Sequence, residues 1–175
     1  QKDLNEIALS LFQLLYLCGY HPTDRGWVFT ASGGETLFGL AVDKYGLDAK
    51  ISPLTGEMDL LKAIKEASKL DRIDLLVGVT WLYLLMHRIV SNPKEFRGLV
   101  VDAVKKKVKV PGIYHLVAGF LLRGIDYEQL RLTLANARLG FSHAEALSPY
   151  LSKIKEVYPR IETHDVFGAT EQWVQ

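Results

Sequence analysis

Ser32 and the glycine pair that follows it are the first residues whose types and spacing could do chemistry. A phosphate-binding loop places Lys and then Ser or Thr after its glycines, but Glu35 follows Gly33 and Gly34 here. The nucleophile of a serine hydrolase is flanked by glycines on both sides, whereas Ser32 has glycines only downstream. A tight turn between two strands explains residues 32–35 better. The sequence therefore predicts neither a phosphate loop nor a serine nucleophile at this position.

Histidine is the next candidate for acid-base or metal chemistry. The chain has five, at His21, His87, His115, His143 and His164. None has a second histidine four residues away, the spacing at which a helix forms a local metal pair. His164 and Asp165 resemble the His-Asp pair of helical metal-dependent phosphohydrolases, but Glu171 is the only carboxylate side chain that follows them. We predict no catalytic residue, metal or cofactor, and keep such a hydrolase as an alternative.

Charge is unevenly distributed, although 21 Lys and Arg side chains nearly balance 20 Asp and Glu side chains. Residues 93–160 hold 12 basic and 6 acidic side chains, so the remainder of the chain is net acidic. Lysines at the end of a helix are explained most simply by solvation and the helix dipole, and alternatively by contact with phosphates. The candidate nucleic-acid-binding residues are Lys105, Lys106, Lys107, Lys109, Arg97, Arg123, Arg131 and Arg138.

The segment 130–154 has the outline of a helix-turn-helix, with residues 139–142 as the turn. Pro149 interrupts its second helix, which has few side chains that could read bases. Two antiparallel helices of a bundle explain the segment better. Any nucleic-acid contact is therefore expected with the backbone, without sequence readout, and RNA and DNA are not distinguished.

Several aromatic side chains fall in segments that offer little core to bury them. Either these segments fold back over the rest of the chain, or they dock on a neighbouring chain. The residues predicted to form a protein interface are Trp27, Phe29, Phe38, Phe167 and Trp173.

The secondary structure that positions these residues is expected to be of a different type in the first third of the chain than in the rest. Residues 20–56 contain many glycines and two prolines between β-favouring runs at 27–30 and 36–38. They predict a small β-hairpin or meander. Residues 49–51 are a candidate third strand, and a helix over 37–45 is the alternative for the central part.

Helical periodicity dominates elsewhere. Apolar residues three and four apart predict a first helix over 4–18, and Asn92, Pro93 and Glu95 form a cap, a first-turn proline and a capping acid. Residues 73–90 are apolar on nearly all sides but shorter than the roughly 20 uncharged residues of a bilayer crossing, so a buried central helix is expected. Further helices are expected over 57–67, over 113–122, from Asp126 to Gly140, and from Ser142 or Pro149 to Val157.

The predicted fold class is mainly α: a compact bundle of six or seven helices with a small β-hairpin or meander insertion after the first helix. One helical domain is expected over residues 1–160, with the insertion at about 20–56, followed by an acidic C-terminal tail over 161–175. The 175 residues, 49% hydrophobic and 23% charged, suffice for one domain with a core and exclude a disordered chain.

The single cysteine excludes an internal disulfide framework and favours a reducing, cytoplasmic location. We predict a non-catalytic subunit of a larger assembly, either a homo-oligomer or part of a multi-protein complex, without a membrane partner. Such a nucleoprotein-type subunit would contact nucleic-acid backbone through its basic half. The alternatives are the metal-dependent phosphohydrolase and a protein-interaction adaptor that binds no nucleic acid.

Overall fold

The computed structural model describes residues 2–30, 34–54, 56–143 and 145–166. Within them the chain forms an α/β fold around a five-stranded parallel sheet. The strands are β1 (Gly26–Thr30), β2 (Ala49–Pro53), β3 (Leu75–Val79), β4 (Leu139–His143) and β5 (Glu162–Val166). The helices are α1 (Lys2–Leu17), α2 (Gly34–Tyr45), α3 (Glu57–Ala67), α4 (Thr80–Ser91), α5 (Pro93–Lys107), α6 (Tyr114–Leu122), α7 (Tyr127–Ala135) and α8 (Leu151–Val157), with a 3-10 turn, η1 (Ser148–Tyr150).

The strand order is β2-β1-β3-β4-β5, so the chain reverses its direction across the sheet between β1 and β3. β1 lies between β2 and β3, and its residue Val28 is in register with Ile51 of β2 and with Val77 of β3. Parallel neighbours need a crossover, and a helix supplies each one. The predicted helical bundle is therefore wrong, and the fold is a layered α/β sheet.

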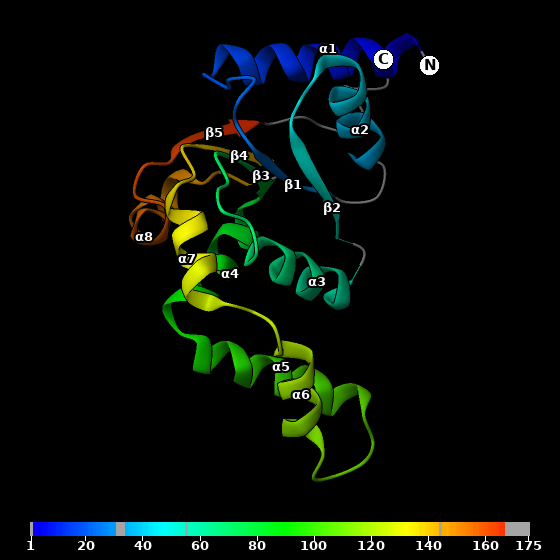
Figure 1. The fold of residues 1–175 in the computed structure, drawn as a ribbon, viewed down its shortest axis with the longest axis vertical. Coiled ribbons are helices and arrows are strands. Elements are labelled where there is room, and N and C mark those ends of the chain that lie inside the picture. The colour runs from blue at the N-terminus through cyan, green and yellow to red at the C-terminus, as the bar shows by residue number, and fades with distance from the viewer. Residues whose placement is uncertain (1, 31–33, 55, 144, 167–175) are drawn as a thin grey trace.

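Helices cover both faces of this sheet (Figure 1). Trp27, Phe29 and Leu76 point into one core, which α3, α4, α7 and α8 complete. Val28 and Leu75 point into the other core, which α1 and α2 cover. The alternation along β1 is that of a strand buried on both faces, and it produces a three-layer arrangement.

The expected β-meander after the first helix is also corrected. The runs at 27–30 and 49–51 do form strands, but they pair in parallel as β1 and β2. Residues 36–38, expected to be a strand, lie within α2, which begins at Gly34. The helix kept as the alternative for 37–45 is the correct one. Residues 32 and 33 of the expected turn lie outside the described part of the chain.

The single buried helix expected over 73–90 is in fact two elements. Residues 75–79 form β3, and α4 follows at Thr80 without an intervening loop. Likewise, residues 139–142, expected as a turn between two helices, lie in β4, and residues 162–166 of the expected acidic tail form β5. Buried parallel strands read as continuous apolar runs, so periodicity cannot separate them from a buried helix.

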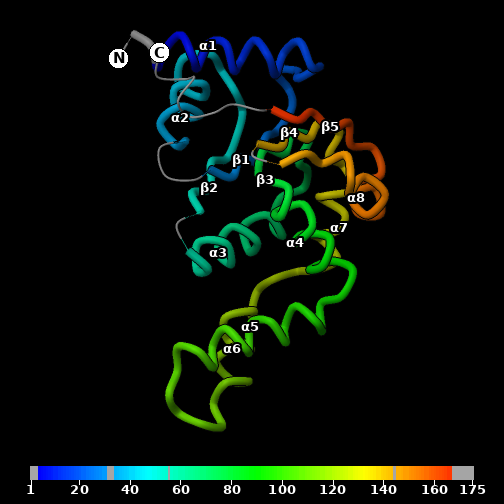
Figure 2. Tube along the Cα trace, turned by 180° about the vertical axis from the view of Figure 1, so that it is seen from behind, coloured from blue at the N-terminus to red at the C-terminus, as the bar shows by residue number. Residues whose placement is uncertain are grey.

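α5 and α6 form a helical hairpin that extends away from the sheet, beyond α3, α4 and α7 (Figures 1 and 2). We call residues 93–125 the arm. It is inserted between β3 and β4, and its inner face packs Phe96, Val100 and Val104 against Ala118 and Leu122. No helix in the described part of the chain is long and apolar enough to cross a membrane.

Candidate functional site

The carboxyl edge of the sheet is the first place to look for a ligand site. In an open parallel sheet, ligands bind beyond the carboxyl ends of the strands, at the point where the strand order reverses. Here that point lies between β1 and β3, so it is bounded by Thr30 at the end of β1 and by Thr80 at the start of α4.

Thr30 ends β1 at this edge, and its environment is unusual. The residue is 3% exposed, and its hydroxyl has no hydrogen-bond partner among the described residues. Gly34, the first residue of α2, packs directly against it: a Cβ added to Gly34 would lie 2.9 Å from the Thr30 Cβ. Only glycine allows this close approach, which brings the amino end of α2 against the end of β1.

A hydroxyl cluster joins the ends of β3 and β4. The Thr80 hydroxyl donates to the Glu145 carbonyl oxygen at 2.7 Å, and the Ser142 hydroxyl lies 2.8 Å from the Thr80 oxygen. Both side chains are buried and satisfied, so they fix the chain that leaves β4. Asp165 on β5 reinforces this, since its carboxylate accepts a hydrogen bond from the Leu147 amide at 2.9 Å. Together these contacts place η1, and with it Tyr150, above α4.

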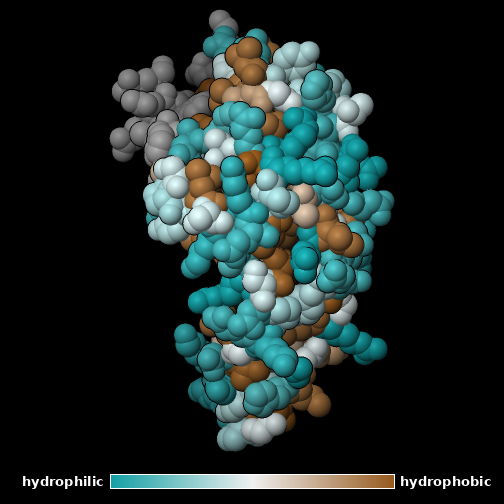
Figure 3. Space-filling model, turned by 90° about the vertical axis from the view of Figure 1, so that its left-hand side faces the viewer, coloured by the Kyte–Doolittle hydropathy of each residue, from teal (hydrophilic) through white to brown (hydrophobic). Residues whose placement is uncertain are grey.

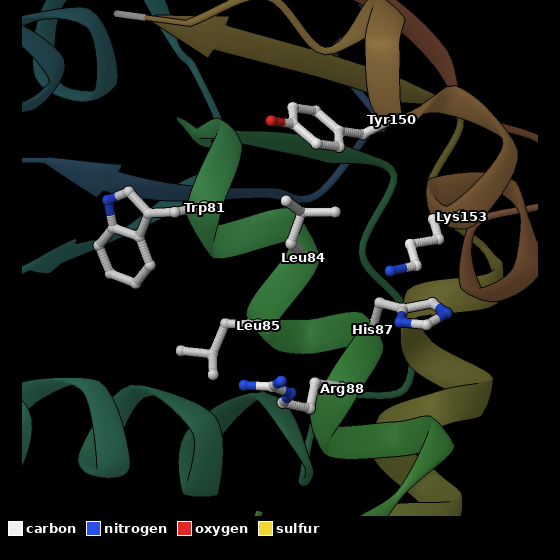
Figure 4. A pocket seen from close by; sticks show the side chains of 7 residues that line it. All are labelled: Trp81, Leu84, Leu85, His87, Arg88, Tyr150 and Lys153. Carbon is white, nitrogen blue, oxygen red and sulfur yellow. The ribbon is translucent and has the colours of Figure 1, made fainter.

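A groove of about 430 Å³ starts at this edge and runs along α4 towards α8. We call it the α4 groove. Its apolar lining is Trp81, Leu84 and Leu85, and Tyr150 lies across from them (Figure 4). Trp81 is the second residue of α4 and 48% exposed, which is unusual for so large an aromatic side chain. Trp81 and Tyr150 lie at the end of the groove nearest the sheet, and Arg88 lies at the opposite end (Figure 4).

Three cationic or titratable side chains line the same groove. His87 Nε2 lies 2.7 Å from the Glu156 carboxylate, and the Arg88 guanidinium pairs with Glu95 at 3.0 Å. Lys153 differs from both, because its ammonium has no ion pair or hydrogen bond with any described residue. It extends from α8 towards α4 (Figure 4). The α4 groove therefore offers an exposed aromatic surface and, among the described residues, one cation without an ion-pair partner.

The structure separates the predicted nucleic-acid-binding residues into distinct groups. Lys105 pairs with Asp102 at 2.9 Å, and Lys107 pairs with Glu57 of α3 at 2.6 Å. Lys106 and Lys109 are exposed at the far end of the arm. These four lysines lie at or just after the end of α5, and the charges of two of them are already paired.

The four predicted arginines do not form a single surface. Arg97 and Arg123 line one pocket at the base of the arm. Arg131 is exposed on α7. Arg138 lies at the amino edge of the sheet, where it pairs with the buried Asp24 carboxylate and donates to the Gly19 carbonyl oxygen at 2.7 Å. Arg138 thus links the segment after α1 to the start of β4, so its role is structural.

Three of the five predicted interface aromatics lie in the core. Trp27 is fully buried, Phe29 is 1% exposed and Phe38 is 7% exposed. The Trp27 indole donates to Ser52 Oγ at 3.0 Å. Burial in the two sheet cores accounts for their aromatic character without a partner chain. Phe167 and Trp173 lie outside the described residues.

His164 and Asp165 are successive residues of β5, so their side chains point to opposite faces of the sheet. The His164 ring stacks on Phe141 with centroids 5.0 Å apart, whereas Asp165 bonds to the backbone of Leu147. The described residues contain no group of three His, Cys, Asp or Glu side chains placed to hold a metal ion. Burial raises the pKa of the Cys18 thiol, which disfavours its thiolate form.

Sequence reasoning missed Trp81 and Tyr150. Trp81 was hidden inside an apolar run that was treated as one helix, and Tyr150 in a segment treated as a bent helix. A strand-to-helix junction at residues 79–80 would have identified Trp81, because it places that side chain at the carboxyl edge of the sheet.

The sequence matches no protein family model, and no curated protein is significantly similar to it. Function must therefore be inferred from the site and not from the fold.

Proposed function

We propose that this protein binds a mononucleotide-type ligand in the α4 groove, at the carboxyl edge of its parallel sheet. The observation that carries the proposal is that one groove of about 430 Å³ is lined both by an exposed tryptophan and by a lysine that has no ion pair with any described residue. Ligand sites for small molecules have this size, with an apolar lining and a few polar groups that fix orientation.

The aromatic part of the ligand would stack on Trp81. Stacking of a base on an aromatic side chain contributes about 1–3 kcal/mol and tolerates any base, because every base has a π face. Leu84 and Leu85 continue this apolar surface along α4. Tyr150, which is 40% exposed, provides a hydroxyl donor at the opposite wall of the groove. A planar ring of nucleobase size suits this arrangement better than a flexible aliphatic chain.

The phosphate of the ligand would bind Lys153. Its ammonium is the cation of the groove that no described carboxylate neutralises, whereas His87 and Arg88 have partners. A hydrogen bond between a charged donor and a phosphate is about twice as strong as a neutral one. The ligand is therefore expected to bind more tightly than its uncharged nucleoside.

Isothermal titration of the protein with the four common ribonucleoside monophosphates and triphosphates, and with the matching nucleosides, tests this function. At least one nucleotide should bind more tightly than its nucleoside. The Lys153→Gln variant should weaken nucleotide binding by roughly 10- to 150-fold, the loss of one hydrogen bond to a charged group, and leave nucleoside binding unchanged. Trp81→Ala should weaken both.

Lys155→Gln is the matched control, since Lys155 lies two residues further along α8 and does not line the groove. It should bind nucleotides as the wild type does. Failure of every nucleotide to bind at millimolar concentration would rule the proposal out. An equal loss in Lys153→Gln and Lys155→Gln would show that general charge, and not the groove, controls binding.

Assembly with other chains is a second candidate function, and one observation favours it. Leu116 and Phe120 of α6 are 76% and 73% exposed, and they share a face because they are four residues apart. Val110, just before the helix, is 55% exposed. Brown, apolar side chains interrupt the polar surface of the lower, arm part of the molecule in Figure 3. Exposed apolar surface of this kind typically marks a protein interface.

Light scattering tests this second candidate. The wild type should have a mass well above the 19.7 kDa of one chain, and the double variant Leu116→Ser with Phe120→Ser should approach that mass. Leu132→Ser is the control, because Leu132 is also exposed, at 54%, but lies on α7 outside the arm. A monomeric wild type at high micromolar concentration would exclude self-association.

A further inference from the structure

A second pocket lies at the base of the arm, where α5 and the end of α6 meet the first residue of α7. Its volume is about 380 Å³, and no carboxylate lines it. Lys94 and Arg97 enter it from α5, and Arg123 enters it from the end of α6. We call it the arm pocket.

None of these three cations has an ion pair with any described residue. The nearby carboxylate of Glu95 is already paired with Arg88, on the side of α4. Within the pocket Arg97 packs against α6, where its terminal nitrogen would lie 3.7 Å from a Cβ added to Gly119. Three like charges around one hollow repel each other, so an anion bound there would stabilise the arrangement.

Tyr127 adds a fourth group to the arm pocket. The hydroxyl is the only neutral hydrogen-bond donor among the side chains that line it. Burial raises the pKa of Tyr127, and the positive charge of Arg97 partly opposes that rise. A protonated Tyr127 can donate to an anion that the three cations attract.

The charge of the whole arm points to a polyanion and not to an isolated ion. Residues 93–125 carry seven Lys and Arg side chains against two Asp and Glu, and both acids are paired within the protein. Lys106 lies exposed at the other end of α5, about three helical turns from Lys94, and the exposed Lys109 follows just after the helix. A chain with repeated phosphates could contact both ends of the arm.

We propose that the arm pocket binds a backbone phosphate of nucleic acid, held by Lys94, Arg97 and Arg123. Arginine suits this role because its planar guanidinium donates two parallel hydrogen bonds to one phosphate. No base-reading element accompanies the pocket, so affinity should depend on charge and salt and little on sequence. The proposal is independent of the α4 groove, since the two sites share no lining residue.

Fluorescence anisotropy with a labelled 20-nucleotide single strand, DNA or RNA, tests this. The double variant Arg97→Gln with Arg123→Gln should bind the strand at least about 100-fold more weakly than the wild type, since two charged hydrogen bonds are lost. Its salt dependence should also fall: the slope of log K against log salt should decrease by about 1.4 for two fewer contacts to a single strand. Thermal melting establishes that the variant is folded.

The control is Lys155→Gln with Arg160→Gln, which removes the same charge from exposed positions on the body of the molecule. It should retain tighter binding than the arm variant, with a larger salt slope. Equal losses in the two variants, or no binding of either strand at 50 mM salt, would overturn the proposal. Binding of inorganic phosphate alone, without the strand, would overturn the assignment to nucleic acid. Lys153→Gln should leave strand binding unchanged, which separates this result from that of the α4 groove.

Discussion

Gly140→Ala tests the packing of β4 between its neighbours. A Cβ added to Gly140 would lie 2.6 Å from Ile161 Cδ1, 3.1 Å from Ile161 Cγ1 and 3.3 Å from the Tyr83 hydroxyl. The backbone of Gly140 does not have a positive φ, so the clash and not backbone strain sets the cost. Ile161 and Tyr83 belong to the buried cluster that joins α4 and the sheet.

The expected loss of stability follows from these distances. Adding a methyl group to a packed core costs about 1–3 kcal/mol. Replacing glycine also restricts the unfolded chain, which offsets about 0.4–1 kcal/mol. The free energy of unfolding should therefore fall by about 1–2 kcal/mol, and the melting temperature by about 2–4 °C for each kcal/mol in a chain of this size.

A double-mutant cycle identifies the cause. Ile161→Val removes the Cδ1 atom that is nearest to the added methyl, and alone costs about 0.5–1.5 kcal/mol. The double variant should be less destabilised than the sum of the single variants by about 1 kcal/mol. Chemical denaturation with urea measures all three.

Gly98→Ala is the control, because nothing lies within 4 Å of a Cβ added there and Gly98 is inside helix α5. It should raise the free energy of unfolding by about 0.5–1 kcal/mol. A Gly140→Ala protein as stable as the wild type, or strictly additive effects with Ile161→Val, would refute the packing described for β4.

Three further results are expected. Tyr158→Phe should raise the free energy of unfolding by about 1 kcal/mol, because the buried Tyr158 hydroxyl has no partner among the described residues. In contrast, Tyr83→Phe should lower the free energy of unfolding by about 0.5–1.5 kcal/mol, because it removes the 2.7 Å hydrogen bond that the Tyr83 hydroxyl donates to the Leu76 carbonyl oxygen. Burial raises the pKa of both phenols above the value of about 10 that a tyrosine has in the unfolded chain. The free energy of unfolding should therefore be highest below pH 10 and should decrease as the pH rises above 10. The urea midpoints at pH 8 and pH 11 measure this decrease, which should be smaller in Tyr158→Phe. Asn92→Ala should cost about 0.5–2 kcal/mol in thermal melting, because the Asn92 side chain caps α5 by accepting from the Glu95 amide at 3.2 Å.

Helix boundaries were largely predictable from the sequence, because their signals are local. Asn92 caps α5 and Pro93 begins it, as expected. Asp126 caps α7 by accepting from the Gln129 amide, which the sequence also indicated. The same local chemistry identified the interruption at Pro149, which lies in η1 just before α8.

The sheet was not predictable in the same way, because parallel pairing joins strands distant in sequence. β3 pairs with β4 across about sixty residues of intervening chain, so no turn signal marks the pair. Gly78 and Gly140 suggested helix or loop positions, yet each makes room for a side chain packed against the sheet. Neither could be interpreted without knowing which segments face them.

The candidate site was the least predictable part. Lys153 belongs to a generally basic segment and has no distinguishing pattern, and Trp81 looks like a residue of a buried helix. Their relation depends on β3 ending at Val79 and on η1 folding back over α4. The pocket at the base of the arm was closer to the sequence prediction, since Arg97 and Arg123 were both identified by their charge.

The most direct test of the proposed nucleotide site is the indole region of a ¹⁵N-correlated NMR spectrum. The chain has three tryptophans, and Trp81→Phe and Trp173→Phe variants assign their signals. Titration with the tightest-binding nucleotide should shift the Trp81 indole signal saturably and leave that of Trp27, which is buried and bonded to Ser52, in place. A Trp81 signal that stays unchanged while the nucleotide binds would contradict the assignment of the α4 groove.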